Sequence, residues 1–84
     1  MNLLFTKEGW EDYLYWQAKD KKILKKINTL LKEMMRTPFE GSGKPEALKY
    51  ELQGCWSRRI NQEHRLVYEV FDEEIHILSC RYHY

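Results

Sequence analysis

The chain has 84 residues, of which 43% are hydrophobic and 14% aromatic, and its formal net charge is only +1. This composition excludes a disordered chain, and the length leaves too little apolar surface for two cores, so we expect one domain over residues 1–84. The apolar run in residues 1–5 is too short for a signal peptide or a membrane span. We therefore expect a soluble, cytoplasmic protein without a membrane partner.

The first predicted elements are a short strand and a helix. Residues 3–5 form an apolar run, and Thr6 follows as a helix N-cap. Trp10, Tyr13 and Leu14 then recur at helical spacing, which predicts an amphipathic helix. We expect these three side chains to lie in the core rather than to form a cofactor site.

A longer helix is predicted to begin at Asp20, a second N-cap, and to run up to Thr37 and Pro38, where the proline ring ends it. Its apolar residues share one arc at helical periodicity. They are Ile23, Leu24, Ile27, Leu30, Leu31, Met34 and Met35.

The opposite side of this predicted helix is basic. Residues 19–36 carry seven cations and only two carboxylates. The cations that lie opposite the apolar arc are Lys22, Lys25, Lys32 and Arg36. Such a face either meets a polyanion or is simply a solvated helix surface, and both interpretations stay open.

The second half of the chain predicts a loop followed by strands. Residues 39–45 hold two glycines, a serine and a proline, which do not form regular structure. Four strand-like runs follow, separated by Gly54 and by two short turns. The runs are 48–53, 55–60, 65–71 and 75–82. Short turns favour an antiparallel meander, and the two amphipathic helices must cover an apolar face, so we expect a two-layer α+β domain.

Adjacent arginines in the second run must point to opposite faces of the sheet. Arg59 lies on one face and Arg58 on the other, where we expect Arg58 to form a salt bridge with a helix carboxylate. Arg59 and Arg65 stand in otherwise apolar strands, which is unfavourable unless they reach an anion. An RNA phosphate would be a suitable anion.

The other histidines and the cysteines predict no site. We expect His64 to be a solvated turn residue and His76 a strand surface residue. Cys55 and Cys80 lie in apolar runs without metal-ligand spacing, so we expect buried, reduced thiols. No motif for a cofactor or a metal is present.

A few polar residues in and after the loop can cleave RNA without a metal. The reaction requires a base for the ribose 2′-OH, an acid for the leaving 5′ oxygen, and cations for the transition state. Glu46 can be the base, His83 the acid, and Arg59 and Arg65 the cations. Glu46 can equally be a turn carboxylate that pairs with Lys49, and the sequence alone leaves both interpretations open.

Six segments together resemble a known family. They are WEDYLYW at 10–16, RTPFEG at 36–41, GKPE at 43–46, WSRRI at 56–60, EHRLVY at 63–68 and CRYHY at 80–84. In this order and spacing they resemble the YoeB toxins of the RelE superfamily, over the whole chain. The resemblance implies two N-terminal helices packed on a mainly antiparallel, RelE-like sheet, and cleavage of mRNA in the ribosomal A site.

The resemblance also implies partners and residue roles. The partners are the ribosome, mRNA and a cognate, YefM-like antitoxin, and a homodimer is compatible with the family. The implied roles are Glu46 as general base, His83 as general acid, Arg65 stabilising the transition state, Lys49 and Arg59 contacting phosphate, and Tyr84 positioning the terminus or the substrate.

Two hypotheses follow. The first is a ribosome-dependent, metal-independent endoribonuclease that forms a 2′,3′-cyclic phosphate, with the cations of the second helix facing ribosomal RNA. The second is a non-catalytic RNA- or protein-binding module on the same fold. Glu46, Arg65 and His83 discriminate between them, because binding alone does not require this set.

Overall fold

The computed structural model describes residues 1–82 of the chain, which form two α-helices, a 3-10 turn and a five-stranded sheet. In chain order the elements are β1 (Asn2–Phe5), α1 (Lys7–Lys19), α2 (Lys21–Met34), β2 (Glu46–Ala47), the 3-10 turn η1 (Tyr50–Leu52), β3 (Trp56–Arg59), β4 (Arg65–Val70) and β5 (Glu74–Ser79).

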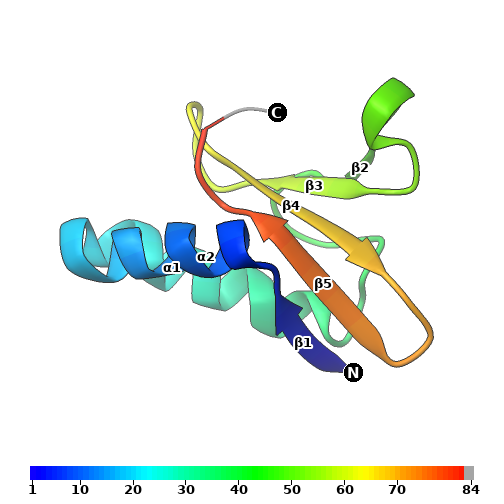
Figure 1. Cartoon of the computed structure of the whole chain (residues 1–84), viewed down its shortest axis with the longest axis horizontal. Coiled ribbons are helices and arrows are strands. Elements are labelled where there is room, and N and C mark those ends of the chain that lie inside the picture. Colours follow the sequence, from blue (N-terminus) through cyan, green and yellow to red (C-terminus); the bar gives the residue numbers. More distant parts are fainter. Residues whose placement is uncertain (83–84) are drawn as a thin grey trace.

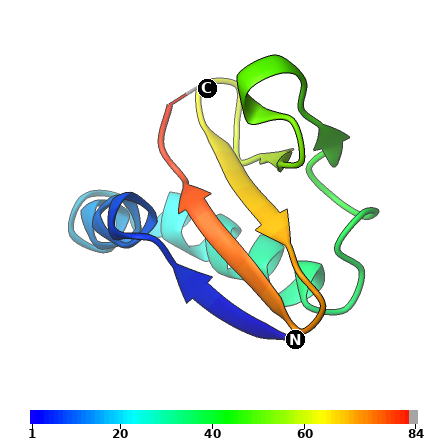
Figure 2. The same ribbon diagram turned by 45° about the vertical axis from the view of Figure 1, so that its right-hand side comes forward.

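The strands form one sheet in the order β1-β5-β4-β3-β2 (Figure 1). β1 is parallel to β5, and every other neighbouring pair is antiparallel. Both helices contribute to a core on one face of the sheet, and Figure 2 shows α1 nearly end-on with α2 behind the strands. The predicted two-layer α+β domain with a mainly antiparallel sheet is therefore confirmed.

Side-chain caps determine where the two helices begin, as predicted. The Thr6 hydroxyl oxygen accepts a hydrogen bond from the Gly9 amide at 3.1 Å. The Asp20 carboxylate caps α2 by accepting from two amides of its first turn, at 3.0 and 3.2 Å. The Asp20 amide also donates to the Trp16 carbonyl oxygen, so one residue ends α1 and starts α2.

The predicted extension of the second helix to Thr37 was wrong, because α2 ends at Met34. Pro38 restricts the backbone of the residue before it, which disfavours a helical conformation for Thr37. Instead, the amides of Arg36 and Thr37 both donate to the Glu33 carbonyl oxygen, at 3.0 and 2.9 Å. This tight turn leads the chain into the loop of residues 37–45.

The main core lies between the helices and the sheet. Its buried α2 residues are Ile27, Leu30, Leu31 and Met34, which confirms the predicted apolar arc. The buried strand residues that pack against them include Leu66, Tyr68, Ile75 and Ile77. On the opposite face a second, smaller cluster of Leu48, Cys55 and Val67 is packed by Leu52 of η1, and neither α-helix contributes to it.

The predicted core face of α1 was right for Tyr13, which packs against the main core, and wrong for the other two residues. Trp10 and Leu14 are 47% and 41% exposed, whereas Trp16 is only 5% exposed. α1 approaches β5 through Gly9, where an added Cβ atom would collide with the Ile77 carbonyl oxygen. Because the residue at the closest contact has no side chain, the apolar pattern of the sequence did not indicate this part of the interface.

The predicted strand over residues 48–53 was also wrong. Glu46 and Ala47 alone pair with β3 in this part of the sheet, and the chain then forms η1. Tyr50 has a φ of 58°, a left-handed backbone that interrupts an extended strand. The other three predicted strands are confirmed with ends shifted by up to three residues, and β5 runs from Glu74 to Ser79.

Candidate active site

Three predicted site residues share the outer face of the sheet, which neither α-helix covers. Glu46 pairs with Ser57 and Arg59 pairs with Arg65, so each pair projects its side chains to one side. Arg58, between Ser57 and Arg59, reaches the helix layer, so its two neighbours face outward. Two residues along a strand span about 7 Å and neighbouring strands lie about 4.8 Å apart. Arg59 therefore lies one such step along the sheet and one strand across from Glu46, and Arg65 lies one strand further.

Arg59 and Arg65 are direct cross-strand neighbours. Like charges in such positions destabilise a sheet. Arg59 is exposed, whereas Arg65 is half-buried and is held by the turn before β4. Its Nη1 donates to the carbonyl oxygens of Asn61, Gln62 and His64, at 2.8, 3.4 and 3.3 Å. The turn therefore keeps Arg65 beside Arg59 in spite of their repulsion, an arrangement suited to an anion.

The prediction that His64 is solvated was wrong. It is 6% exposed, and its ring packs edge-on against Trp16 with centroids 4.7 Å apart. Its Nδ1 accepts a hydrogen bond from the Tyr82 amide at 2.7 Å, and the Tyr82 carbonyl oxygen accepts from the Arg65 amide at 3.0 Å. The chain after β5 thus folds back over the turn, which local sequence does not reveal.

α1 fixes the chain just after β5. The Cys80 amide donates to the Asp12 carboxylate at 3.0 Å, and the Trp16 indole N–H donates to the Cys80 carbonyl oxygen at 2.8 Å. Burial raises the pKa of the Asp12 carboxyl. His83 and Tyr84, the predicted acid and positioning residue, lie outside the described residues.

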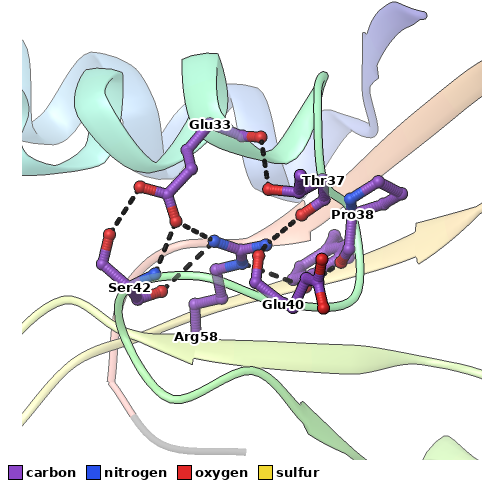
Figure 3. Close-up of polar contacts among 7 residues, drawn as sticks. Glu33, Thr37, Pro38, Glu40, Ser42 and Arg58 are labelled. Atoms are coloured by element: carbon purple, nitrogen blue, oxygen red, sulfur yellow. Dashed lines mark hydrogen bonds and ion pairs between the residues drawn. The ribbon is translucent and has the colours of Figure 1, made fainter.

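Arg58 lies on the helix side of the sheet, fully buried, and binds the loop that leads to Glu46 (Figure 3). Its Nη1 bonds the Glu33 carboxylate at 2.8 Å, which confirms the predicted salt bridge. Its Nε donates to the Tyr68 hydroxyl oxygen at 3.2 Å. It also donates to the carbonyl oxygens of Thr37, Glu40 and Ser42, at 2.6, 2.8 and 3.2 Å. One guanidinium therefore binds three points of the loop.

Glu33 binds the same loop from α2. The Ser42 hydroxyl donates to its carboxylate at 2.6 Å, and the Ser42 amide donates to the same group. These hydrogen bonds, helped by Arg58, hold the pKa of the Glu33 carboxyl below its ordinary value. An arginine in an apolar strand signals such a partner, but the sequence did not indicate the serine or the backbone acceptors.

We expect this carboxylate to make stability depend on pH. Because the pKa of Glu33 is lowered in the folded state, its ionised form stabilises the fold above the ordinary value of 4.5, and the stabilisation is lost as pH falls through the folded value. Thermal unfolding midpoints of the wild type and Glu33→Gln should therefore differ near neutral pH and converge in acid. Midpoints that stay equally far apart at every pH would contradict this expectation.

Comparison with known proteins identifies the family. Residues 5–84 match the sequence profile described as the YoeB-like toxin of bacterial type II toxin–antitoxin systems. The chain belongs to the YoeB-like toxins. It is 62% identical to Toxin YoeB of Escherichia coli strain K12 over the full length of both, and 57% identical to Toxin YoeB of a Synechocystis species over all of this chain and 98% of that protein.

Solved structures of other YoeB-like toxins have the same fold. The YoeB/ParE toxin from Agrobacterium tumefaciens is 46% identical with a TM-score of 0.97, and both chains are covered completely. A YoeB dimer from Staphylococcus aureus is 56% identical with a TM-score of 0.93, over 100% of this chain and 98% of that one. A RelBE2 complex from Mycobacterium tuberculosis, 24% identical with a TM-score of 0.74, shares the fold, so the predicted RelE-like architecture is confirmed.

The remaining predicted residues of this YoeB-like toxin are all solvent-facing. Lys49 is exposed at the start of η1. The cations predicted to lie opposite the apolar arc of α2 are also exposed: Lys22, Lys25, Lys32 and Arg36. The basic face, meaning these four residues, is therefore available to a partner.

The other expected features concern metals, membranes and thiols. Within residues 1–82, no group of three or more His, Cys, Asp or Glu side chains could hold a metal ion, and no helix is long and apolar enough to cross a membrane. Cys55 and Cys80 are free and buried, as predicted, and burial raises the pKa of Cys80 to about 12. His76 is partly exposed on β5, where it contacts Glu74 at 3.1 Å.

Proposed function

We propose that this toxin is a ribosome-dependent endoribonuclease that cleaves mRNA in the A site by metal-independent general acid–base catalysis. The observation that carries the proposal is the pairing of Arg59 with Arg65 on the open face of the sheet. Two adjacent guanidinium groups are unfavourable for the fold and favourable for a phosphate, because each can form short, charge-assisted hydrogen bonds to its oxygens. Glu46 on the same face supplies a base next to that phosphate.

The reaction needs only side chains. Glu46 takes the proton from the ribose 2′-OH, and the 2′ oxygen attacks the adjacent phosphorus. Arg59 and Arg65 stabilise the additional negative charge of the pentavalent transition state. The bond to the 5′ oxygen breaks as His83 donates a proton to it, which leaves a 2′,3′-cyclic phosphate and a 5′-OH. Tyr84 positions the terminus or the substrate, and Lys49 contacts a phosphate.

The partners extend the same proposal. The basic face of α2 contacts ribosomal RNA, since exposed cations that neutralise phosphates release bound counterions. Staphylococcus aureus YoeB has been solved as a dimer and in a heterotetrameric complex with YefM. We propose that this chain forms the same two assemblies. In the complex, a YefM-like antitoxin covers Arg59 and Arg65, so RNA cannot bind them.

The chemistry at the cut ends tests the proposal. Ribosomes programmed with a defined mRNA should yield a 2′,3′-cyclic phosphate and a 5′-OH when this protein is added. A single 2′-deoxynucleotide at the cleaved position should abolish cutting, because the attacking oxygen is missing. The matched control carries the 2′-deoxynucleotide a few positions away and should be cut at the normal rate. A 3′-OH with a 5′-phosphate, or cutting at the deoxynucleotide, would refute the mechanism.

A further inference from the structure

A basic pocket of about 500 Å³ opens beside the arginine pair. Lys26 from α2, Lys44 from the loop, Arg59 from β3 and Arg65 from β4 all line it. Among the described residues that line the pocket, none has a carboxylate side chain. Four cations from four segments therefore converge on one open pocket, of which the proposed reaction uses only the two arginines.

The backbone holds Lys44 at this pocket in an unfavourable conformation. Its φ is 51°, a left-handed value that L-residues other than asparagine and aspartate seldom adopt. Gly43 before it has a φ of 82°, and its carbonyl oxygen accepts a hydrogen bond from the Arg59 amide at 2.6 Å. Strained residues of this kind persist where the surrounding structure enforces them, and they concentrate at functional sites.

Contacts of Arg58 hold the loop in this conformation. Its guanidinium binds the Ser42 carbonyl oxygen at 3.2 Å, two residues before Lys44, and the Glu33 carboxylate at 2.8 Å (Figure 3). An added Cβ on Gly43 would lie 3.1 Å from the Arg58 Cβ and 3.0 Å from the Arg59 carbonyl oxygen, so the loop lies directly on β3. The loop cannot relax without losing these contacts, and Lys44 stays at the pocket.

We propose that this pocket is a second phosphate-binding subsite, in which Lys26 and Lys44 hold the phosphodiester next to the one that is cleaved. The assignment of RNA as the ligand rests on the proposed function. Arg59 and Arg65 line the pocket and also face the proposed reaction centre, so they connect two successive phosphates of one strand. Lysine suits this task because its ammonium group neutralises a phosphate as a point charge without bidentate geometry.

Binding of a non-cleavable strand tests the subsite. A short 2′-deoxy oligonucleotide lacks the attacking hydroxyl, so its affinity for the isolated full-length protein can be measured at several salt concentrations. The slope of log K against log salt should fall by about 0.7 for each phosphate contact that is lost from a single strand. We expect this change for Lys26→Gln and for Lys44→Gln. The control Lys7→Gln removes one exposed charge from α1 and should keep the wild-type slope.

A second variant separates binding from folding. Lys44→Gly removes the cation and also the backbone strain, because glycine adopts a positive φ freely. Its thermal midpoint should equal or exceed that of the wild type, while its salt slope falls as in Lys44→Gln. Slopes of the pocket variants that match Lys7→Gln, or no measurable binding by the wild type, would overturn the subsite. If the Lys26 and Lys44 variants show the expected lower slopes but the wild-type protein never cuts mRNA, the subsite stands and the nuclease mechanism is refuted.

Discussion

Glu46→Gln is expected to lower the single-turnover rate of mRNA cleavage by about 10²–10⁴-fold, the usual contribution of general acid–base catalysis. Glutamine keeps the shape of the side chain but cannot accept the 2′-OH proton. Ribosome affinity should hardly change, because the basic face of α2 is untouched. The assay is single-turnover cleavage on programmed ribosomes, with ribosome binding measured in parallel. His83→Gln should lose rate to a similar extent.

A matched control is available in the same segment. Glu51 is an exposed carboxylate of η1, so Glu51→Gln makes the same chemical change without touching the proposed base. It should cleave at the wild-type rate. Full-rate cleavage by Glu46→Gln would exclude Glu46 as the base. A wild-type protein that binds ribosomes and cuts nothing would favour the non-catalytic binding module instead.

Arg58→Met should destabilise the fold by about 3 kcal/mol or more, because each hydrogen bond of a charged group contributes about 1.5–3 kcal/mol and Arg58 makes several. Arg58 is fully buried, and its loss removes the cation from Glu33 and leaves the carbonyl oxygens of Thr37 and Glu40 without this donor. Denaturant unfolding followed by circular dichroism gives the free energy directly. Arg58→Lys should be intermediate, because one ammonium group cannot reach all of the acceptors that the guanidinium binds.

The neighbouring residue provides the control for this change. Arg59→Met removes the same charge one position along β3, on the exposed outer face. Its effect should stay within about 0.5 kcal/mol, as for other surface positions, and relief of the repulsion from Arg65 acts in the stabilising direction. Equal destabilisation by the two variants would show that Arg58 has no special role in holding the loop.

Local rules correctly predicted the helix caps, the start of α2 and its buried side, but not its end. Asp20 and Thr6 act through contacts within a few residues, and the apolar arc of α2 faces a broad sheet, so periodicity alone identifies its buried side. The same rule failed for Trp10 and Leu14 of α1, because this helix contacts β5 through Gly9, which has no side chain. The short β2 and η1 were missed because Leu48 packs with Cys55 and Val67 in a second apolar cluster, a tertiary effect.

The site was predictable where alternation along strands decides it. Because successive residues of a strand face opposite sides of the sheet, Arg58 and Arg59 were predicted on different faces. Arg58 was correctly predicted on the side where it forms its salt bridge. The burial of His64 and the convergence of Lys26 with Lys44 depend on how the tail and the loop fold back over β3 and β4. Such paths are set by hydrogen bonds between residues far apart in sequence, and no local pattern encodes them.

The strand order has a consequence for the time at which the protein becomes folded. β5 lies between β1 and β4, and the Thr6 hydroxyl contacts the Ile77 carbonyl oxygen across 71 residues of chain. While the chain is being synthesised, β1 and α1 therefore emerge long before the strand they need, and such non-local pairing is slow to form. The hydrogen bond from the Arg65 amide to the Tyr82 carbonyl oxygen likewise forms only after residue 82 has been synthesised. The sheet, and with it the contact of Arg65 with the tail, should therefore form only once β5 and Tyr82 are available to pair.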